Sequence, residues 1–328
     1  MGVVASFPHG LLPLALDFSG SVAKPFLFGL ANGAGFGLVA VGLVLIYKSS
    51  RVFNFAAGEF ATLGAFGLYL GVHGFHLPYP LAMVLGVLTG TVAGLVSERL
   101  VVRPLADRPK VTILVATAAV AILLIPLELI LGGTKTFQVL PAFRSGVTVA
   151  GTKILGPIGI TLFDTGISPQ QLLVALVLGI FGVVLAWFFA RTDLGLATLA
   201  SSQEPTATRL MGIRLNRISM LTWGTAGFLG GLAGVLLPAI TESFAAGYGT
   251  TNVLIPAFAA AVLGGMTSVP GAFLGGIGVG LIQAFAQFDL TKIPGTTTDL
   301  PGSDSLALLV VLIAVLLIRP AGLLGKEA

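Results

Sequence analysis

The sequence predicts an all-α fold, a polytopic transmembrane bundle of about eight or nine spans with some broken or re-entrant helices. Apolar residues make up 55% of the 328 residues and charged residues only 9%, whereas a soluble domain carries about 25% charged residues. Apolar stretches recur from residue 26 to residue 319, and a span needs about 20 such residues. The 45 glycines fit this class, because glycine lets membrane helices approach closely.

Most of the expected helices are separated by proline or glycine. In chain order they are residues 26–47, 53–72, 79–101, 111–131, 171–190, 218–240, 252–266, 270–287 and 304–319. Segment 252–266 is short for a span, and the break at 48–51 is very tight. Irregular backbone in a membrane is tolerated only where it lines a cavity or is buried in protein. We treat residues 1–328 as one domain, and the apolar run 11–16 lacks the basic leader of a signal peptide.

Basic residues predict the orientation. Twelve of the 17 Lys and Arg residues fall on one side if the helices alternate and 252–287 forms a hairpin: Lys48, Arg51, Arg99, Arg103, Arg108, Lys110, Arg191, Arg209, Arg214, Arg217, Arg319 and Lys326. Cytoplasmic loops are rich in basic residues, so 98–110, 191–217 and the C-terminus are predicted to be cytoplasmic. The loop 132–170 then faces outside. This clustering explains the net charge of +4 by topology and gives no reason to expect nucleic acid.

Motifs for chemistry are missing from the sequence. It has no cysteine and three histidines, and it shows no phosphate-binding loop, metal-ligand cluster or Ser/His/Asp set. We therefore expect no enzyme activity, no metal and no cofactor bound by this chain. A transporter of this kind is passive, driven by an ion, or coupled to a separate ATPase.

Asn54 and Glu59 are polar residues in an apolar segment. A carboxylate at bilayer depth is costly and usually faces the bundle interior or a wet cavity, which makes both residues candidates for a translocation path. Alternatively, Glu59 lies near the cytoplasmic interface, pairs with Lys48 or Arg51 and fixes the helix break. Glu128 is a second buried-acid candidate, or it extends towards water.

Small residues recur at four-residue spacing in several helices, which places them on one helix face and predicts close packing. The candidates for packing, or for a subunit interface or transport path, are Gly264, Gly265, Gly271, Gly275, Gly276 and Gly280. The same spacing occurs at Gly86, Gly90 and Gly94 and at Gly227, Gly231 and Gly234.

The loop 191–217 is too long and too apolar in pattern to be a simple connector. Ala207, Leu210 and Met211 recur at helical spacing, and Pro205 suits a first helical turn. A short amphipathic helix there must bury its apolar face against lipid headgroups, against the protein's own helix ends, or in a partner protein.

Four blocks together resemble the LivH-type permeases of branched-chain amino acid ABC importers, over about residues 26–325. They are residues 32–59, 98–105, 260–272 and 319–325. Ala57 stands where the family usually has a histidine, so no role of that imidazole transfers. By position in the first block, the resemblance implies that Asn32, Asn54 and Glu59 lie on the substrate path.

The resemblance also implies an assembly and a mechanism. The chain would translocate branched-chain or related amino acids by alternating access in the bacterial plasma (inner) membrane, surrounded by lipid. Its partners would be a second permease subunit (a sister LivM-type chain or itself), two ATP-binding cassette subunits that use ATP, and an extracytoplasmic substrate-binding protein. The alternatives are a urea or amide permease of the same family, and a self-sufficient secondary transporter or channel in which Glu59 or Glu128 couples to an ion.

Permeases of this kind dock on their ATPase through a short cytoplasmic helix with an EAAxxxG pattern. Residues 206–212 keep its spacing, although Thr206 and Thr208 replace the acid and the second alanine. The expected coupling residues are Glu204, Thr206, Ala207, Thr208, Arg209 and Gly212.

We predict that Gly212→Leu uncouples ATP hydrolysis from uptake, because a bulky side chain prevents the short helix from docking. The measurement compares ATPase activity and solute uptake in the assembled transporter. Unchanged transport by this variant would refute the coupling assignment.

Overall fold

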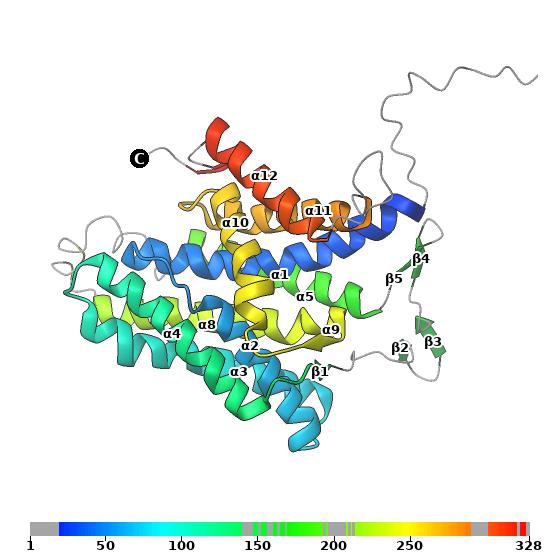
Figure 1. Ribbon diagram of the computed structural model, residues 1–328, viewed down its shortest axis with the longest axis horizontal. Coiled ribbons are helices and arrows are strands. Elements are labelled where there is room, and N and C mark those ends of the chain that lie inside the picture. The colour runs from blue at the N-terminus through cyan, green and yellow to red at the C-terminus, as the bar shows by residue number, and fades with distance from the viewer. Residues whose placement is uncertain are drawn as a thin grey trace, which may run out of the picture.

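The computed structural model describes residues 20–139, 169–192, 214–289, 301–319 and 322–325, four short strands between 147 and 167, and residues 195, 208 and 211. It confirms the predicted polytopic helical fold (Figure 1). Within these residues, five helical stretches are long and apolar enough to cross a bilayer: Pro25–Ser50, Tyr79–Leu105, Lys110–Ile130, Leu215–Thr241 and Val269–Phe288.

The helical elements follow the predicted segments closely. They are α1 (Gly20–Ser50), α2 (Ala57–Tyr69), η1 (Leu70–Gly74), α3 (Tyr79–Ser97), η2 (Glu98–Val102), η3 (Arg103–Leu105), α4 (Lys110–Gly132), α5 (Pro169–Arg191), α8 (Leu215–Leu236), α9 (Pro238–Thr241), η4 (Gly249–Leu254), α10 (Ile255–Gly264), α11 (Val269–Asp289) and α12 (Ser303–Ile318). The tight break expected at 48–51 lies at residues 51–56, and the short segment expected at 252–266 consists of the end of η4 and α10.

Short antiparallel ribbons, which the sequence did not predict, lie in the connection after α4. They pair β2 (Val147–Val149) with β3 (Thr152–Leu155), and β4 (Ile160–Leu162) with β5 (Thr165–Ile167). A third ribbon pairs β1 (Phe137–Gln138) with β6 (Ser243–Phe244). Backbone outside a helix still needs hydrogen-bond partners, and strand pairing supplies them.

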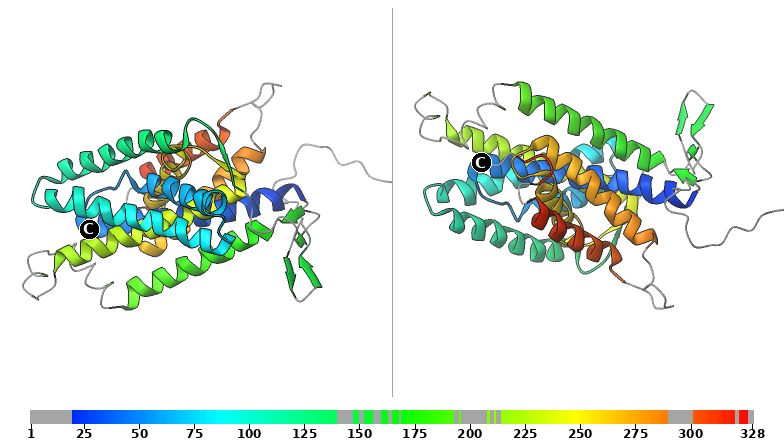
Figure 2. Two further views of the ribbon diagram at one scale, coloured as in Figure 1. Left: turned by 90° about the horizontal axis from the view of Figure 1, so that it is seen from below. Right: turned by 90° about the horizontal axis from the view of Figure 1, so that it is seen from above.

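The ends of the helices lie at the two ends of the molecule, in the order that helices alternating in direction would give. The β2–β5 ribbons and the first residues of α1 and α5 lie at one end of the molecule, and η2, η3 and the C-terminal segment lie at the other (Figures 1 and 2). The segments rich in basic residues therefore share one end. Near it, Arg103 and Glu98 form an ion pair of 2.8 Å, and Arg103 also donates to the Asn216 carbonyl oxygen at 3.4 Å, which fastens η2 to α8.

Helix α2 lies at the centre of the bundle (Figure 2). It has only 13 residues, and ten of them, on all sides of the helix, are buried. A helix that is apolar all round is expected to be buried, and its alanines and glycines let α3 and α8 pack close to it. Adding a methyl carbon to Gly234 of α8 would overlap the Ala61 carbonyl oxygen of α2.

The glycine-rich segment 33–37 of α1 packs against the glycines of α11. A methyl carbon on Gly33 of α1 would lie 2.8 Å from the Gly276 carbonyl oxygen of α11, and methyl carbons on Gly276 and Gly280 would overlap α1. Gly264 and Gly271 likewise approach each other. These glycines therefore let α1, α10 and α11 pack closely within the chain.

The C-terminal segment caps α10. Gly265, with φ of 100°, ends this helix. The amide groups of Leu323 and Leu324 then donate to the carbonyl oxygens of Leu263 and Gly264, at 2.8 and 3.1 Å. The last carbonyl groups of a helix have no partner within it, so the segment 322–324 satisfies two of them.

A helix break between α9 and α10 is held by two buried carboxyl groups. Glu59 of α2 has no exposed surface and accepts hydrogen bonds from the Thr62 hydroxyl at 2.8 Å and from the Thr250 amide at 3.0 Å. The Thr250 hydroxyl also donates to it. The Gly249 amide donates to the Thr62 hydroxyl at 2.8 Å, so Glu59 and Thr62 together satisfy the first backbone donors of η4.

Glu128 of α4 is also fully buried, and it accepts a hydrogen bond of 2.9 Å from the Gly247 amide. It therefore does not extend towards water. The structure pairs Glu59 with hydroxyl and amide donors rather than with Lys48 or Arg51. Both acids serve the irregular backbone of residues 247–250.

We predict that Gly234→Ala destabilises the folded protein by about 1–3 kcal/mol, the usual cost of overpacking. The matched control is Gly179→Ala, because an added methyl carbon there meets nothing within 4 Å. The test heats both variants in detergent and follows their melting by the size-exclusion profile, which gives a melting temperature for each. Equal melting temperatures would contradict the close packing of α2 and α8.

We also predict that Glu59→Ala speeds amide hydrogen exchange at residues 249–250, because hydrogen bonds to a charged group contribute about 1.5–3 kcal/mol each. Glu59→Gln retains one acceptor oxygen and should fall between Glu59→Ala and the natural chain. The control is Glu242→Gln, which changes an exposed carboxylate in the same connection. Exchange that is unaffected by Glu59→Ala would show that this carboxylate does not hold the break.

Candidate functional site

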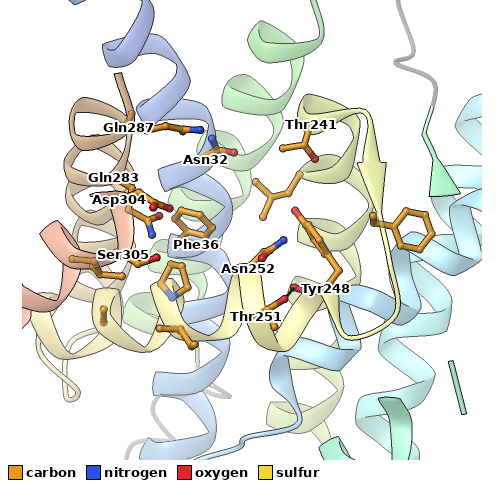
Figure 3. A pocket seen from close by; sticks show the side chains of 18 of the residues that line it. Asn32, Phe36, Thr241, Tyr248, Thr251, Asn252, Gln283, Gln287, Asp304 and Ser305 are labelled. Atoms are coloured by element: carbon orange, nitrogen blue, oxygen red, sulfur yellow. Dashed lines mark hydrogen bonds between the residues drawn. The ribbon is translucent and has the colours of Figure 1, made fainter. Parts of the chain in front are cut away.

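A cavity of about 710 Å³ lies between α1, the η4–α10 segment, α11 and the start of α12 (Figure 3). Cavities of about 300–1,000 Å³ are typical of small-molecule sites. Its polar lining residues are Asn32, Thr136, Thr241, Ser243, Tyr248, Thr251, Asn252, Gln283, Gln287, Asp304 and Ser305. This cavity is the candidate functional site.

Two long helices present their lining residues at helical spacing. In α1 the lining positions are Phe28, Asn32 and Phe36, four residues apart. In α11, Gln283 and Gln287 are also four residues apart. Residues at this spacing share one helix face. The glycine contacts between α1 and α11 hold these faces next to each other, so Asn32 and Gln287 lie close together in Figure 3.

The helix break forms a third wall. Glu59 and Glu128 fix residues 247–250 from behind, and Thr251 and Asn252 follow directly. The Thr251 hydroxyl donates to the Gly247 carbonyl oxygen at 3.1 Å, whereas the Asn252 side chain is exposed and points into the cavity (Figure 3). The irregular segment lines a cavity, which is where such backbone is tolerated in a membrane.

The first turn of α12 closes the cavity. Gly302, with φ of 74°, precedes the helix. The hydroxyl of buried Ser303 donates to the Ala286 carbonyl oxygen of α11 at 3.0 Å. This bond fixes the start of α12 on α11, and it places Asp304 and Ser305 beside Gln283 (Figure 3).

Most polar groups in the cavity are available to a ligand. In the described part of the chain, the side chains of Asn32, Asn252, Gln283, Gln287, Asp304 and Ser305 carry no hydrogen bond or ion pair to protein. Apolar side chains complete the wall: Phe36, Leu237, Phe258 and Leu308. A cavity of this kind can hold a small solute that has one polar end and one apolar end.

Of the predicted path residues, the structure places Asn32 in the cavity, whereas Asn54 and Glu59 are absent from its lining. Asn54 is buried, and its side-chain oxygen accepts the Ala56 amide at 3.0 Å, which forms the turn before α2. Glu59 holds the helix break. Glu59 therefore supports the cavity from behind, whereas Asn54 holds the turn before α2.

Sequence reasoning missed Gln283, Gln287, Asn252, Asp304 and Ser305. A signal was present for the first two, since two carboxamides four residues apart in an apolar helix point to the bundle interior. The other three could not be found this way, because they lie at a helix break and at a helix start.

Of the predicted coupling residues, Glu204, Thr206, Ala207, Arg209 and Gly212 lie outside the described residues. Thr208 is described, and it is helical and buried. Among the residues that the structure places, no group of three or more His, Cys, Asp or Glu could hold a metal ion.

Comparison with known proteins identifies the family. Residues 26–318 match the model of one protein family. That family is described as the permease component of the branched-chain amino acid transport system. No solved structure matches the chain.

Three relatives have similar length. The high-affinity branched-chain amino acid transport system permease protein BraD of Pseudomonas aeruginosa is 29% identical over 91% of this chain and 94% of that protein. The probable branched-chain amino acid transport permease protein LivH of Methanocaldococcus jannaschii is 29% identical over 88% of each chain. The high-affinity LivH permease protein of Escherichia coli K12 is 26% identical over 91% of this chain and 94% of that protein.

The matched region contains every residue that lines the cavity, from Phe28 to Leu312. Together with the apolar helices and the bundle fold, this match makes the chain a membrane-embedded transmembrane permease subunit. The chain belongs to the permease component family of branched-chain amino acid transport systems.

Proposed function

We propose that this permease translocates branched-chain or related amino acids through the membrane as one subunit of an ATP-driven importer. The observation that carries the proposal is the family match over residues 26–318, which includes all the cavity-lining elements. The names of the relatives in Pseudomonas aeruginosa and Escherichia coli point to the same solutes.

The cavity is the proposed substrate path. Its free carboxamide and hydroxyl groups can hydrogen-bond the polar end of an amino acid, and Phe36, Leu237, Phe258 and Leu308 can contact a branched side chain. It lies between α1 residues 28–36 and the start of α12. This is the half of the bundle away from the C-terminal segment.

The orientation follows from the basic residues. With the C-terminus and residues 98–110 in the cytoplasm of a bacterial cell, the cavity faces the outer side of the plasma (inner) membrane. Solute would enter there from an extracytoplasmic binding protein. Alternating access would then close this side and open the cytoplasmic side.

Energy would come from partner subunits. We place two ATP-binding cassette subunits on the cytoplasmic face, with residues 204–212 as the docking segment. A second permease, either a sister chain or a copy of this one, would complete the channel. This chain itself shows no phosphate-binding loop in its sequence.

The alternative of a self-sufficient carrier in which Glu59 or Glu128 couples to an ion receives no support. Both carboxyl groups are instead buried in the contacts that hold the helix break. The apolar wall does not favour a urea or amide permease, because urea and short amides have little apolar surface to contact it.

We predict ATP-dependent uptake of leucine by proteoliposomes that contain the permease with its ATPase, its second permease subunit and its binding protein. An ATPase variant without catalytic activity is the control and should abolish uptake. Urea at the same concentration should not accumulate. Leucine uptake that persists without ATP hydrolysis and follows a sodium or proton gradient would refute the proposal.

A further inference from the structure

One lining residue of the cavity differs from the others in charge. Of the described residues around the cavity, Asp304 is the charged one, and the other polar groups are carboxamides and hydroxyls. Asp304 is partly exposed and lies beside Gln283 and Ser305 (Figure 3). Its carboxylate has no ion-pair or hydrogen-bond partner in the part of the chain that the structure places.

An unpaired carboxylate in such a place selects for positive charge. Apolar walls and surrounding lipid reduce the screening of its charge, so its interaction with a cation is stronger than in bulk water. No lysine or arginine is among the described lining residues, so a positively charged group of a solute meets no repulsion there.

A simpler explanation for an acidic residue at position 304 is that it lies in the first turn of α12. Acidic residues in the first turn of a helix interact favourably with the helix dipole. However, the start of α12 already has a fixed position through the Ser303–Ala286 hydrogen bond. The dipole effect also does not require the side chain to face the cavity, as it does here.

We propose that Asp304 binds the ammonium group of the translocated solute, so that the cavity accepts amino acids in preference to neutral amides. This inference rests on the proposed function, in which the cavity is the substrate path. The amide group of Asn252 lies across the cavity from Asp304 in Figure 3 and can donate to the carboxylate of the same solute, and the amide groups of Asn32 and Gln287 are further donors in the lining. The apolar wall then receives its side chain.

The first test measures the charge in the cavity without any transport. Because the chain has no cysteine, Gln283→Cys introduces a single thiol next to Asp304. Its rates of modification by a cationic and an anionic methanethiosulfonate reagent are compared in the presence of Asp304 and of Asp304→Asn. We expect the ratio of cationic to anionic rate to fall at least about fivefold in the double variant, since a nearby unit charge is worth about 1 kcal/mol even in water. An unchanged ratio would overturn the proposal.

The second test measures leucine uptake by the assembled transporter with Asp304→Asn and Asp304→Glu. Uptake should fall about tenfold with Asp304→Asn and recover in large part with Asp304→Glu. Asparagine also suits a helix start, so a role in the helix alone would leave uptake unchanged. That result would overturn the proposal even if the first test succeeds.

The two tests separate this inference from the proposed function. If the natural transporter takes up no leucine with ATP, the proposed function fails, and the ammonium assignment fails with it. If it takes up leucine and Asp304→Asn does so equally well, only the assignment of Asp304 fails.

Discussion

The carboxylate of Glu59 is the interaction on which the arrangement of the cavity depends. It lies in the middle of an apolar bundle, where an unpaired backbone amide costs several kcal/mol. By accepting from Thr250, and from Gly249 through Thr62, it allows the chain to leave and re-enter helical structure between α9 and α10. A continuous helix there could not direct Asn252 and Thr251 towards α11 and α12.

Close packing of glycines provides the frame in which this carboxylate acts. In lipid, helices have no hydrophobic drive to associate, so contacts between small residues and hydrogen bonds must hold them. Gly234 lets α8 pack on the Ala61 backbone of α2, two residues beyond Glu59. Gly33 lets α1 pack on α11, and this contact brings Asn32 to Gln287. The polar groups that α1 and α11 present to the cavity are therefore positioned by glycine contacts nearby.

Much of the fold could be predicted from the sequence. The positions of the helices could be predicted from the apolar segments and from the proline and glycine residues between them. Each apolar segment must leave water and must satisfy its backbone hydrogen bonds in lipid by itself, so this signal is local in the sequence. The glycine-rich regions 33–37 and 264–276 looked alike only in composition, and nothing in the sequence indicated that they pack against each other. Such a contact depends on the order of helices in space, which a single sequence does not contain.

The site was harder to predict for a related reason. Glu59 and Asn54 were found because buried polar residues in apolar segments are unusual, but the same argument cannot tell a residue that lines a cavity from one that supports it. Only the hydrogen bonds of Glu59 show that it supports the break. Asp304 and Ser305 start a helix, where acids and hydroxyls are common, so their exposure to the cavity had no sequence signal.

Glu59 holds the helix break so that Asn252, and not its buried neighbour Val253, faces the cavity. Single cysteines at these two positions, introduced into the cysteine-free chain, can be treated with a membrane-impermeant thiol reagent. We predict that Asn252→Cys reacts, that Val253→Cys does not, and that adding Glu59→Ala removes the difference. Equal reaction at both positions while Glu59 is present would contradict this prediction.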